Sequence, residues 1–89
     1  MSATAPRVPK GFHTVTPYLI FKDAAVAIEF YERAFGATEL FRKADDDGRI
    51  RHAEMRIGTS PIMLAGEFAE FPEWQSAETR RGSPVHLYL

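Results

Sequence analysis

A histidine and a glutamate two residues apart form the most chemically capable pair in this sequence. His52 and Glu54 lie in a stretch, residues 49–57, whose composition and alternation are typical of a β-strand. Because strand side chains alternate between faces, both should point the same way. A carboxylate beside an imidazole can bind a divalent metal ion, or it can orient the imidazole for acid–base chemistry. The structural alternative is a hydrogen-bond network that crosses the sheet.

Two ligands do not complete a metal centre, because catalytic zinc sites generally use about three protein ligands. The third would come from Glu67, from His86 or from another chain. Glu67 follows the last strand of the predicted hairpin, where a shift of one residue would turn it to the other face. Its alternative role is that of a solvated loop carboxylate. Cysteine is absent, which excludes thiolate metal sites and disulfides.

The elements that must position these residues begin with a strand and a helix. Residues 14–21 are rich in β-branched and aromatic side chains and predict a strand. Pro17 cannot donate a ladder hydrogen bond, so this strand should lie at an edge of the sheet. The apolar spacing predicts a helix over residues 24–35, with Asp23 as its N-cap and Gly36 as the left-handed residue that ends it.

Three further strands are expected, at residues 38–43, 49–57 and 60–65. Gly58-Thr59 suits a two-residue hairpin, and this turn places Met55 opposite Ile62. The apolar face of the hairpin should then pack on the helix. The opposite face is mixed, as in a concave ligand-binding surface, and carries His52, Glu54, Met63 and Ala65.

The last segment, residues 84–89, repeats the pattern of the first strand. Val85, Tyr88 and Leu89 match Val15, Tyr18 and Leu19 at the same spacing, which places His86 at the position of Thr16. The repeat predicts that this segment opens a second structural unit. Before this segment come three aromatic residues at a spacing of three, Phe68, Phe71 and Trp74. They could cover the concave face, or they could fill the edge of a core or an interface.

Four stretches together resemble one known superfamily: Thr16-Pro17-Tyr18-Leu19, the helix over residues 27–37, residues 52–58, and Ile62-Met63-Leu64-Ala65. The combination is similar to the vicinal-oxygen-chelate superfamily of glyoxalases, bleomycin-resistance proteins and dioxygenases, in its PhnB-like branch. The resemblance implies two β-α-β-β-β modules that enclose a ligand or metal site. Some members use the metal catalytically, and others bind drugs without it. The ligand position on the first strand is held here by Thr16, a poor metal ligand.

We therefore expect an α+β fold, with one β-α-β-β-β module of glyoxalase type and the opening strand of a second. Residues 1–12 are predicted to form a flexible tail and residues 13–89 the partial domain. The candidate ligand pocket consists of Thr16, Tyr18, His52, Glu54, Met63, His86 and Tyr88. The candidate ligands of a divalent metal ion are His52, Glu54, Glu67 and His86.

Our leading hypothesis for function is the binding of a small molecule in the concave sheet. The alternatives are a divalent-metal-dependent lyase or dioxygenase-like enzyme and a dimerising interaction module, and we expect a homodimer. The chain has 11 basic and 12 acidic residues, which gives no indication of nucleic-acid binding. No apolar run approaches the roughly 20 residues of a membrane span, and the N-terminus lacks the apolar centre of a signal peptide. We expect a cytoplasmic protein.

Overall fold

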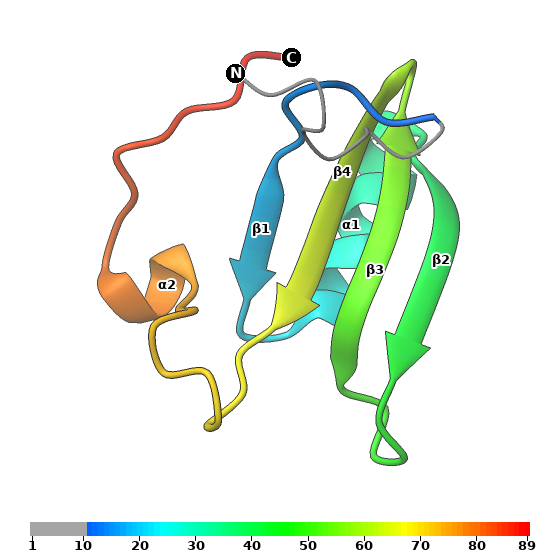
Figure 1. Ribbon diagram of the computed structural model, residues 1–89. Coiled ribbons are helices and arrows are strands. Elements are labelled where there is room, and N and C mark those ends of the chain that lie inside the picture. Colours follow the sequence, from blue (N-terminus) through cyan, green and yellow to red (C-terminus); the bar gives the residue numbers. More distant parts are fainter. Residues whose placement is uncertain (1–10) are drawn as a thin grey trace, which may run out of the picture.

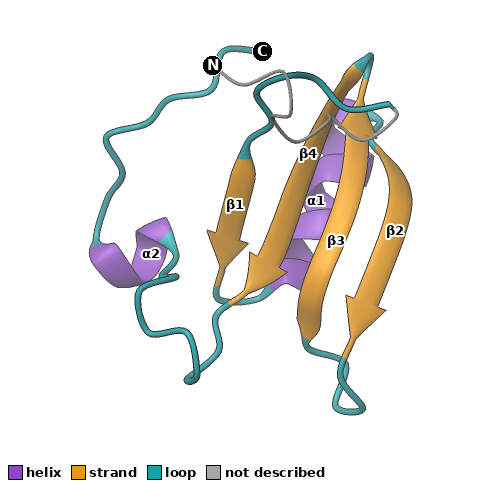
Figure 2. Ribbon diagram, in the orientation of Figure 1, coloured by secondary structure: helices purple, strands orange, loops and turns teal. Residues whose placement is uncertain are grey.

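The computed structural model describes residues 11–89, in which one long helix covers one face of a four-stranded sheet (Figure 1). In chain order the elements are β1 (Tyr18–Phe21), α1 (Ala24–Phe35), β2 (Thr38–Ala44), β3 (Ile50–Ile57), β4 (Ser60–Gly66) and the short α2 (Ala77–Arg80). Figure 2 shows α1 behind the sheet, with α2 and the C-terminal segment beside β1. The face turned away from α1 is therefore left for a site.

The order of strands in the sheet is β1-β4-β3-β2. β1 is parallel to β4, and the other neighbours are antiparallel. This arrangement confirms the predicted β-α-β-β-β module and the position of the first strand at an edge. β1 has one neighbour among the described residues, and the homodimer stays a prediction.

Both predicted ends of α1 are confirmed. The side chain of Asp23 accepts a hydrogen bond from the backbone N–H of Val26 at 3.2 Å, which satisfies one of the free amides of the first turn. Gly36 follows the helix with a φ of 64°, a left-handed conformation that glycine adopts without a steric penalty. These caps fix where the chain enters and leaves the helix.

The core lies between α1 and the sheet, as the apolar pattern predicts. The hairpin register is confirmed, with Met55 opposite Ile62 and Glu54 opposite Met63. Met55 and Leu64 are 0% exposed and pack with Ile28 of α1. Burial of this one face is what holds the opposite face in a fixed register.

Two predicted strands differ from the structure. β1 begins at Tyr18 rather than at residue 14; Pro17 has no N–H to donate, although its carbonyl accepts from the amide of Met63 at 2.9 Å. Residues 84–89 form no strand, so the predicted opening strand of a second module is not present in this structure. A strand needs a neighbour for its ladder hydrogen bonds, and this segment pairs with no strand among the described residues, although the outer edge of β1 is free.

The predicted N-terminal tail falls almost wholly outside the described residues, since only Gly11 and Phe12 of residues 1–12 belong to them. Neither residue is part of a helix or strand. No helix in the described part of the chain is both long and apolar enough to cross a membrane.

Candidate functional site

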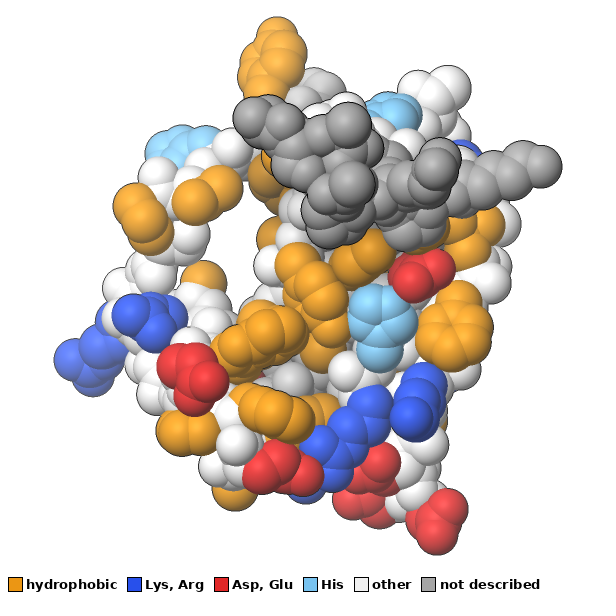
Figure 3. All heavy atoms as spheres, in the orientation of Figure 1, with side chains coloured by type: hydrophobic (Ala, Val, Ile, Leu, Met, Phe, Trp, Pro, Cys, Tyr) orange, Lys and Arg blue, Asp and Glu red, His pale blue; other side chains and the backbone are white. Residues whose placement is uncertain are grey.

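A row of side chains crosses the sheet on the face turned away from α1. Backbone pairing aligns four residues, one from each strand, in the order Tyr18, Met63, Glu54 and Phe41. Residues paired across strands point to the same face, so they form one continuous surface. Figure 3 shows this face, where hydrophobic side chains lie on two sides of a histidine, with an acidic group above it and a basic group below. The predicted mixed face is present, and Tyr18 and Met63 lie on it as expected.

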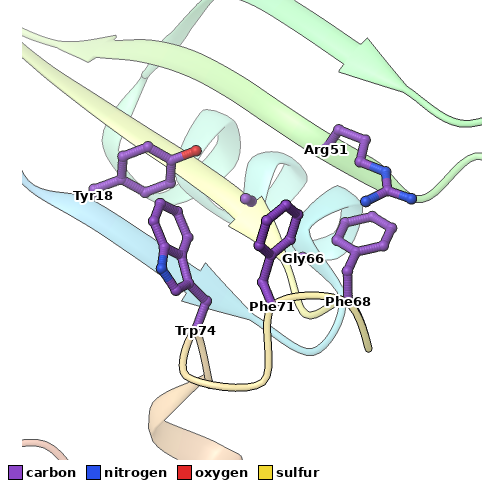
Figure 4. Close-up of a pocket in the computed structure, with 7 residues that line it drawn as sticks. Tyr18, Arg51, Gly66, Phe68, Phe71 and Trp74 are labelled. Carbon is purple, nitrogen blue, oxygen red and sulfur yellow. The ribbon is translucent and has the colours of Figure 1, made fainter.

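A cavity of about 240 Å³ lies between this face and the segment that follows β4. The sheet supplies one wall, and aromatic side chains of the segment rise toward it (Figure 4). The lining residues are Tyr18, Arg51, Ala65, Gly66, Phe68, Phe71 and Trp74. Most of this lining is aromatic or apolar, which favours a ligand with an apolar part.

A β-bulge directs Arg51 into the cavity. Lys43 pairs with His52, but the next residue, Ala44, pairs with Ile50, so Arg51 is the extra residue of β3. Ile50 consequently joins the core, at 2% exposed, while Arg51 and His52 both serve the opposite face. Strict alternation had placed Arg51 on the helix side, and the sequence analysis missed it. The sequence did carry a signal of the bulge. The core-facing residues Ile50, Ala53 and Met55 are separated by three and then two positions, whereas a regular strand would separate them by two throughout.

Phe68 fastens the segment after β4 to β3. Its ring is 8% exposed, and the guanidinium carbons of Arg49 and Arg51 lie 4.3 and 3.7 Å from the ring centroid. Arg51 also forms ion pairs of 3.0 Å with Asp45 and with Glu70. The hydrogen bonds from Arg51 lower the pKa of the Asp45 carboxyl. The charge of Arg51 is thus shared between two carboxylates.

Tyr18, His52 and Glu54 form a chain of hydrogen bonds beside the cavity. The Tyr18 hydroxyl lies 2.9 Å from Nδ1 of His52, and Nε2 of His52 lies 2.9 Å from Oε2 of Glu54. Burial, and secondarily the negative charge of Glu54, raises the pKa of the Tyr18 hydroxyl. The His52–Glu54 pair predicted from the sequence is therefore joined, and it takes the form of a network across strands β1 and β3.

Aromatic rings enclose the cavity on the side away from β3. Trp74 meets the ring of Tyr18 edge to face, with centroids 5.2 Å apart and planes at 79°. Phe71 lies 6.3 Å from Trp74, centroid to centroid. The side chains of Trp74 and Phe71 point from the segment toward the sheet (Figure 4), and both are about half exposed. A flat ligand entering here would meet rings on two sides.

Of the seven predicted pocket residues, Tyr18 alone lines this cavity. His52, Glu54 and Met63 lie beside it on the same face of the sheet, and the other three lie elsewhere. The Thr16 hydroxyl donates to the backbone carbonyl of His13 at 3.3 Å. His86 and Tyr88 are exposed in the C-terminal segment, and Tyr88 lies at a different hollow, together with Leu87 and Leu89. Because residues 84–89 form no strand, no sheet register aligns His86 and Tyr88 with β1.

Glu67 serves the fold rather than a metal ion. Its carboxylate accepts a 2.7 Å hydrogen bond from the backbone N–H of Ser76, the N-cap of α2. Hydrogen bonding from the Thr79 side chain, and from the Ser76 side chain and amide, lowers the pKa of Glu67 to about 2. Glu67 thereby ties the start of α2 to the end of β4.

The predicted metal set does not assemble. Across residues 11–89, no three histidine or carboxylate side chains lie close enough together to hold a metal ion. Nε2 of His52 contacts Glu54, Glu67 is held by Ser76, and His86 is exposed in the C-terminal segment. The donor set of the described residues therefore does not fit a catalytic divalent metal, which needs about three convergent ligands.

The low pKa of Glu67 predicts a loss of stability in acid. A carboxyl whose pKa falls on folding stabilises the native state above its ordinary pKa of 4.5, and this contribution disappears as the pH falls through about 2. Glu67→Gln should therefore flatten the decline of the thermal unfolding midpoint between pH 4.5 and 2. Glu73→Gln, in the same exposed segment, should keep the steeper decline of the unmodified protein. Equal slopes for the two variants would contradict the role of Glu67.

Sequence comparison gives a family and a relative. The sequence pattern of the Glyoxalase/Bleomycin resistance protein/Dioxygenase superfamily matches residues 11–77. An uncharacterized protein of Mycobacterium tuberculosis is 36% identical over 103 aligned positions, which cover 100% of this chain and 61% of that protein. The chain thus spans about three fifths of the length of this relative.

Two solved structures share the fold. TioX from Micromonospora sp. ML1 is 27% identical with a TM-score of 0.54, over 63% of this chain and 44% of TioX. A PhnB protein from Bacillus cereus is 21% identical with a TM-score of 0.54, over 60% of this chain and 47% of that one. Both likenesses agree with the glyoxalase-type β-α-β-β-β fold of the described residues.

Proposed function

The chain belongs to the Glyoxalase/Bleomycin resistance protein/Dioxygenase superfamily, and we propose that within it the concave face of the sheet binds a small molecule whose flat apolar part enters the cavity beside Trp74. The observation that carries this proposal is the cavity itself, with rings on two sides and polar groups at its edge. Ligand sites combine an apolar lining with a few convergent polar groups in this way.

The small volume of the cavity indicates that it is only part of a ligand site, and that the rest of the site lies outside the described residues. Its volume of about 240 Å³ is below the roughly 300–1,000 Å³ of typical small-molecule sites. The chain spans 61% of its mycobacterial relative, and the superfamily resemblance implies that two modules enclose a site. The cavity then holds one ring or ring pair of the ligand, and another module or copy contributes the remaining wall.

Small-molecule binding needs fewer groups from outside the described residues than the two alternative functions do. The metal-dependent enzyme requires a third ligand beside His52 and Glu54, which residues 11–89 do not supply, so another module or copy would have to provide it. The interaction module would use the half-exposed rings of Phe71 and Trp74 as a contact, but these two rings also line the cavity, and Phe68 is buried. Small-molecule binding needs no rearrangement of the aromatic segment, because its rings already line the cavity.

We expect Trp74→Ala to weaken the binding of aromatic fragments about tenfold or more, because it removes the largest ring of the cavity. A library of neutral aromatic fragments, screened by ligand-observed NMR and followed by titration, measures this. Leu40→Ala is the control, since Leu40 is a similarly exposed apolar residue of β2 and lines neither this cavity nor the hollow at Tyr88. A library without any hit, or hits that Trp74→Ala leaves unchanged, would contradict the proposal.

A further inference from the structure

The hydrogen-bond chain that ends on Tyr18 has a direction, and Glu54 sets it. An ionised carboxylate can only accept hydrogen bonds. The 2.9 Å contact between Glu54 and His52 therefore requires a proton on Nε2 of His52. In a neutral imidazole the other nitrogen, Nδ1, is then an acceptor.

This direction decides what Tyr18 can offer to a ligand. Because Nδ1 of His52 accepts, the 2.9 Å contact with Tyr18 uses the proton of the tyrosine hydroxyl. Burial raises the pKa of Tyr18, which keeps that proton in place. The Tyr18 oxygen is left with its lone pairs alone, and it presents an acceptor. Figure 4 shows the hydroxyl at the end of the ring turned toward β3, on the same side as Arg51.

The charges around the cavity argue against an anionic ligand. Arg51 is the cationic group in the lining, and it already forms 3.0 Å ion pairs with Asp45 and with Glu70. These two carboxylates already balance the charge of Arg51, so an anion would find little net attraction there. Its charge would also lie near Glu54, whose negative charge already raises the pKa of Tyr18. The surroundings therefore favour a neutral ligand.

From these three observations we propose that the cavity takes a neutral, planar aromatic ligand that directs an N–H or O–H donor at the Tyr18 oxygen. The proposal rests on the proposed function and adds the class of ligand. The aromatic rings that line the cavity, Tyr18, Phe71 and Trp74 among them, favour a flat molecule that can pack on them. The direction of the Glu54–His52–Tyr18 hydrogen bonds decides which polar group the ligand must carry. A ligand acceptor placed there would face the lone pairs of the Tyr18 oxygen and be repelled.

Two methylated indoles test the donor requirement directly. 3-Methylindole keeps the ring N–H, whereas 1-methylindole has the same atoms but no donor. We expect 3-methylindole to bind the protein about three- to tenfold more tightly than 1-methylindole, the range of one hydrogen bond. Titration by ligand-observed NMR at pH 8, above the ordinary range of histidine protonation, measures both.

Two variants show whether the preference comes from the chain. Tyr18→Phe keeps the ring and removes the oxygen, so it should bind both methylindoles equally. His52→Leu frees the Tyr18 hydroxyl to donate, so it should bind quinoline, which has a single ring acceptor, about threefold or more tighter than the unmodified protein does. A preference that survives in Tyr18→Phe would overturn the role of this residue.

The outcomes separate this inference from the proposed function. Equal binding of the two methylindoles, or tighter binding of 1-methylindole, overturns the donor requirement and leaves the aromatic cavity intact. Failure of both methylindoles, when other neutral fragments bind in a manner that depends on Trp74, also overturns the inference alone. A fragment library without any hit overturns both proposals.

Discussion

Leu64→Ala should lower the free energy of unfolding by about 2–5 kcal/mol, the range for truncating a fully buried leucine. Leu64 is 0% exposed in β4, between Leu19 of β1 and Ala53 of β3. Its side chain belongs to the core between the sheet and α1. Small domains have only about 5–15 kcal/mol of stability, so this change should bring the chain close to unfolding.

Urea unfolding followed by far-ultraviolet circular dichroism measures this loss. Leu40→Ala is the matched control, because Leu40 is 40% exposed at a bulge of β2 and should cost far less. Leu64→Met, which nearly conserves volume, should cost less than about 1.5 kcal/mol. A Leu64→Ala variant as stable as Leu40→Ala would show that α1 does not cover this face in solution.

Phe68→Ala should cost about 3 kcal/mol and should also release the segment that forms the outer wall of the cavity. Phe68 is 8% exposed, and its ring contacts the guanidinium groups of Arg49 and Arg51. Removing the ring leaves both arginines without their apolar contact and separates β3 from the segment. Trp74, six residues further on, should then become more accessible.

The comparison with Phe71→Ala makes this prediction specific. Phe71 belongs to the same segment and the same cavity, but it is 50% exposed, so its truncation should change stability much less. Urea unfolding gives the stability of each variant. Acrylamide quenching of Trp74, the single tryptophan, reports on the segment under native conditions. Equal stability and quenching in the two variants would show that Phe68 does not fasten the segment.

The sequence could predict the parts of the fold that depend on local chemistry. Asp23 and Gly36 mark the ends of α1 because an N-cap acceptor and a left-handed glycine act within a few residues. The Gly58-Thr59 turn fixes the register of β3 and β4, because a two-residue hairpin allows little freedom. From that register alone, His52, Glu54 and Met63 fall on one face.

Long-range contacts explain what the sequence could not provide. The predicted strand at residues 84–89 was inferred from a repeat, and a strand forms only where a neighbour accepts its hydrogen bonds. Glu67 was considered as a metal ligand or a solvated carboxylate, but it caps the amide of Ser76, nine residues away. Neither the missing strand nor the contact of Glu67 with Ser76 can be read from the residues that adjoin each of them in the sequence.

By itself, then, the sequence determined the order of the elements from β1 to β4, the boundaries of α1 and the face that carries the His52–Glu54 pair. Only the tertiary structure decided the site that this pair serves. The bulge that brings Arg51 to the side of His52 depends on the pairing of β3 with β2, and the hydrogen bond to Tyr18 depends on the β1–β4 pair. The physical reason is that periodicity assigns a residue to a face, whereas packing between distant segments decides which residues meet there.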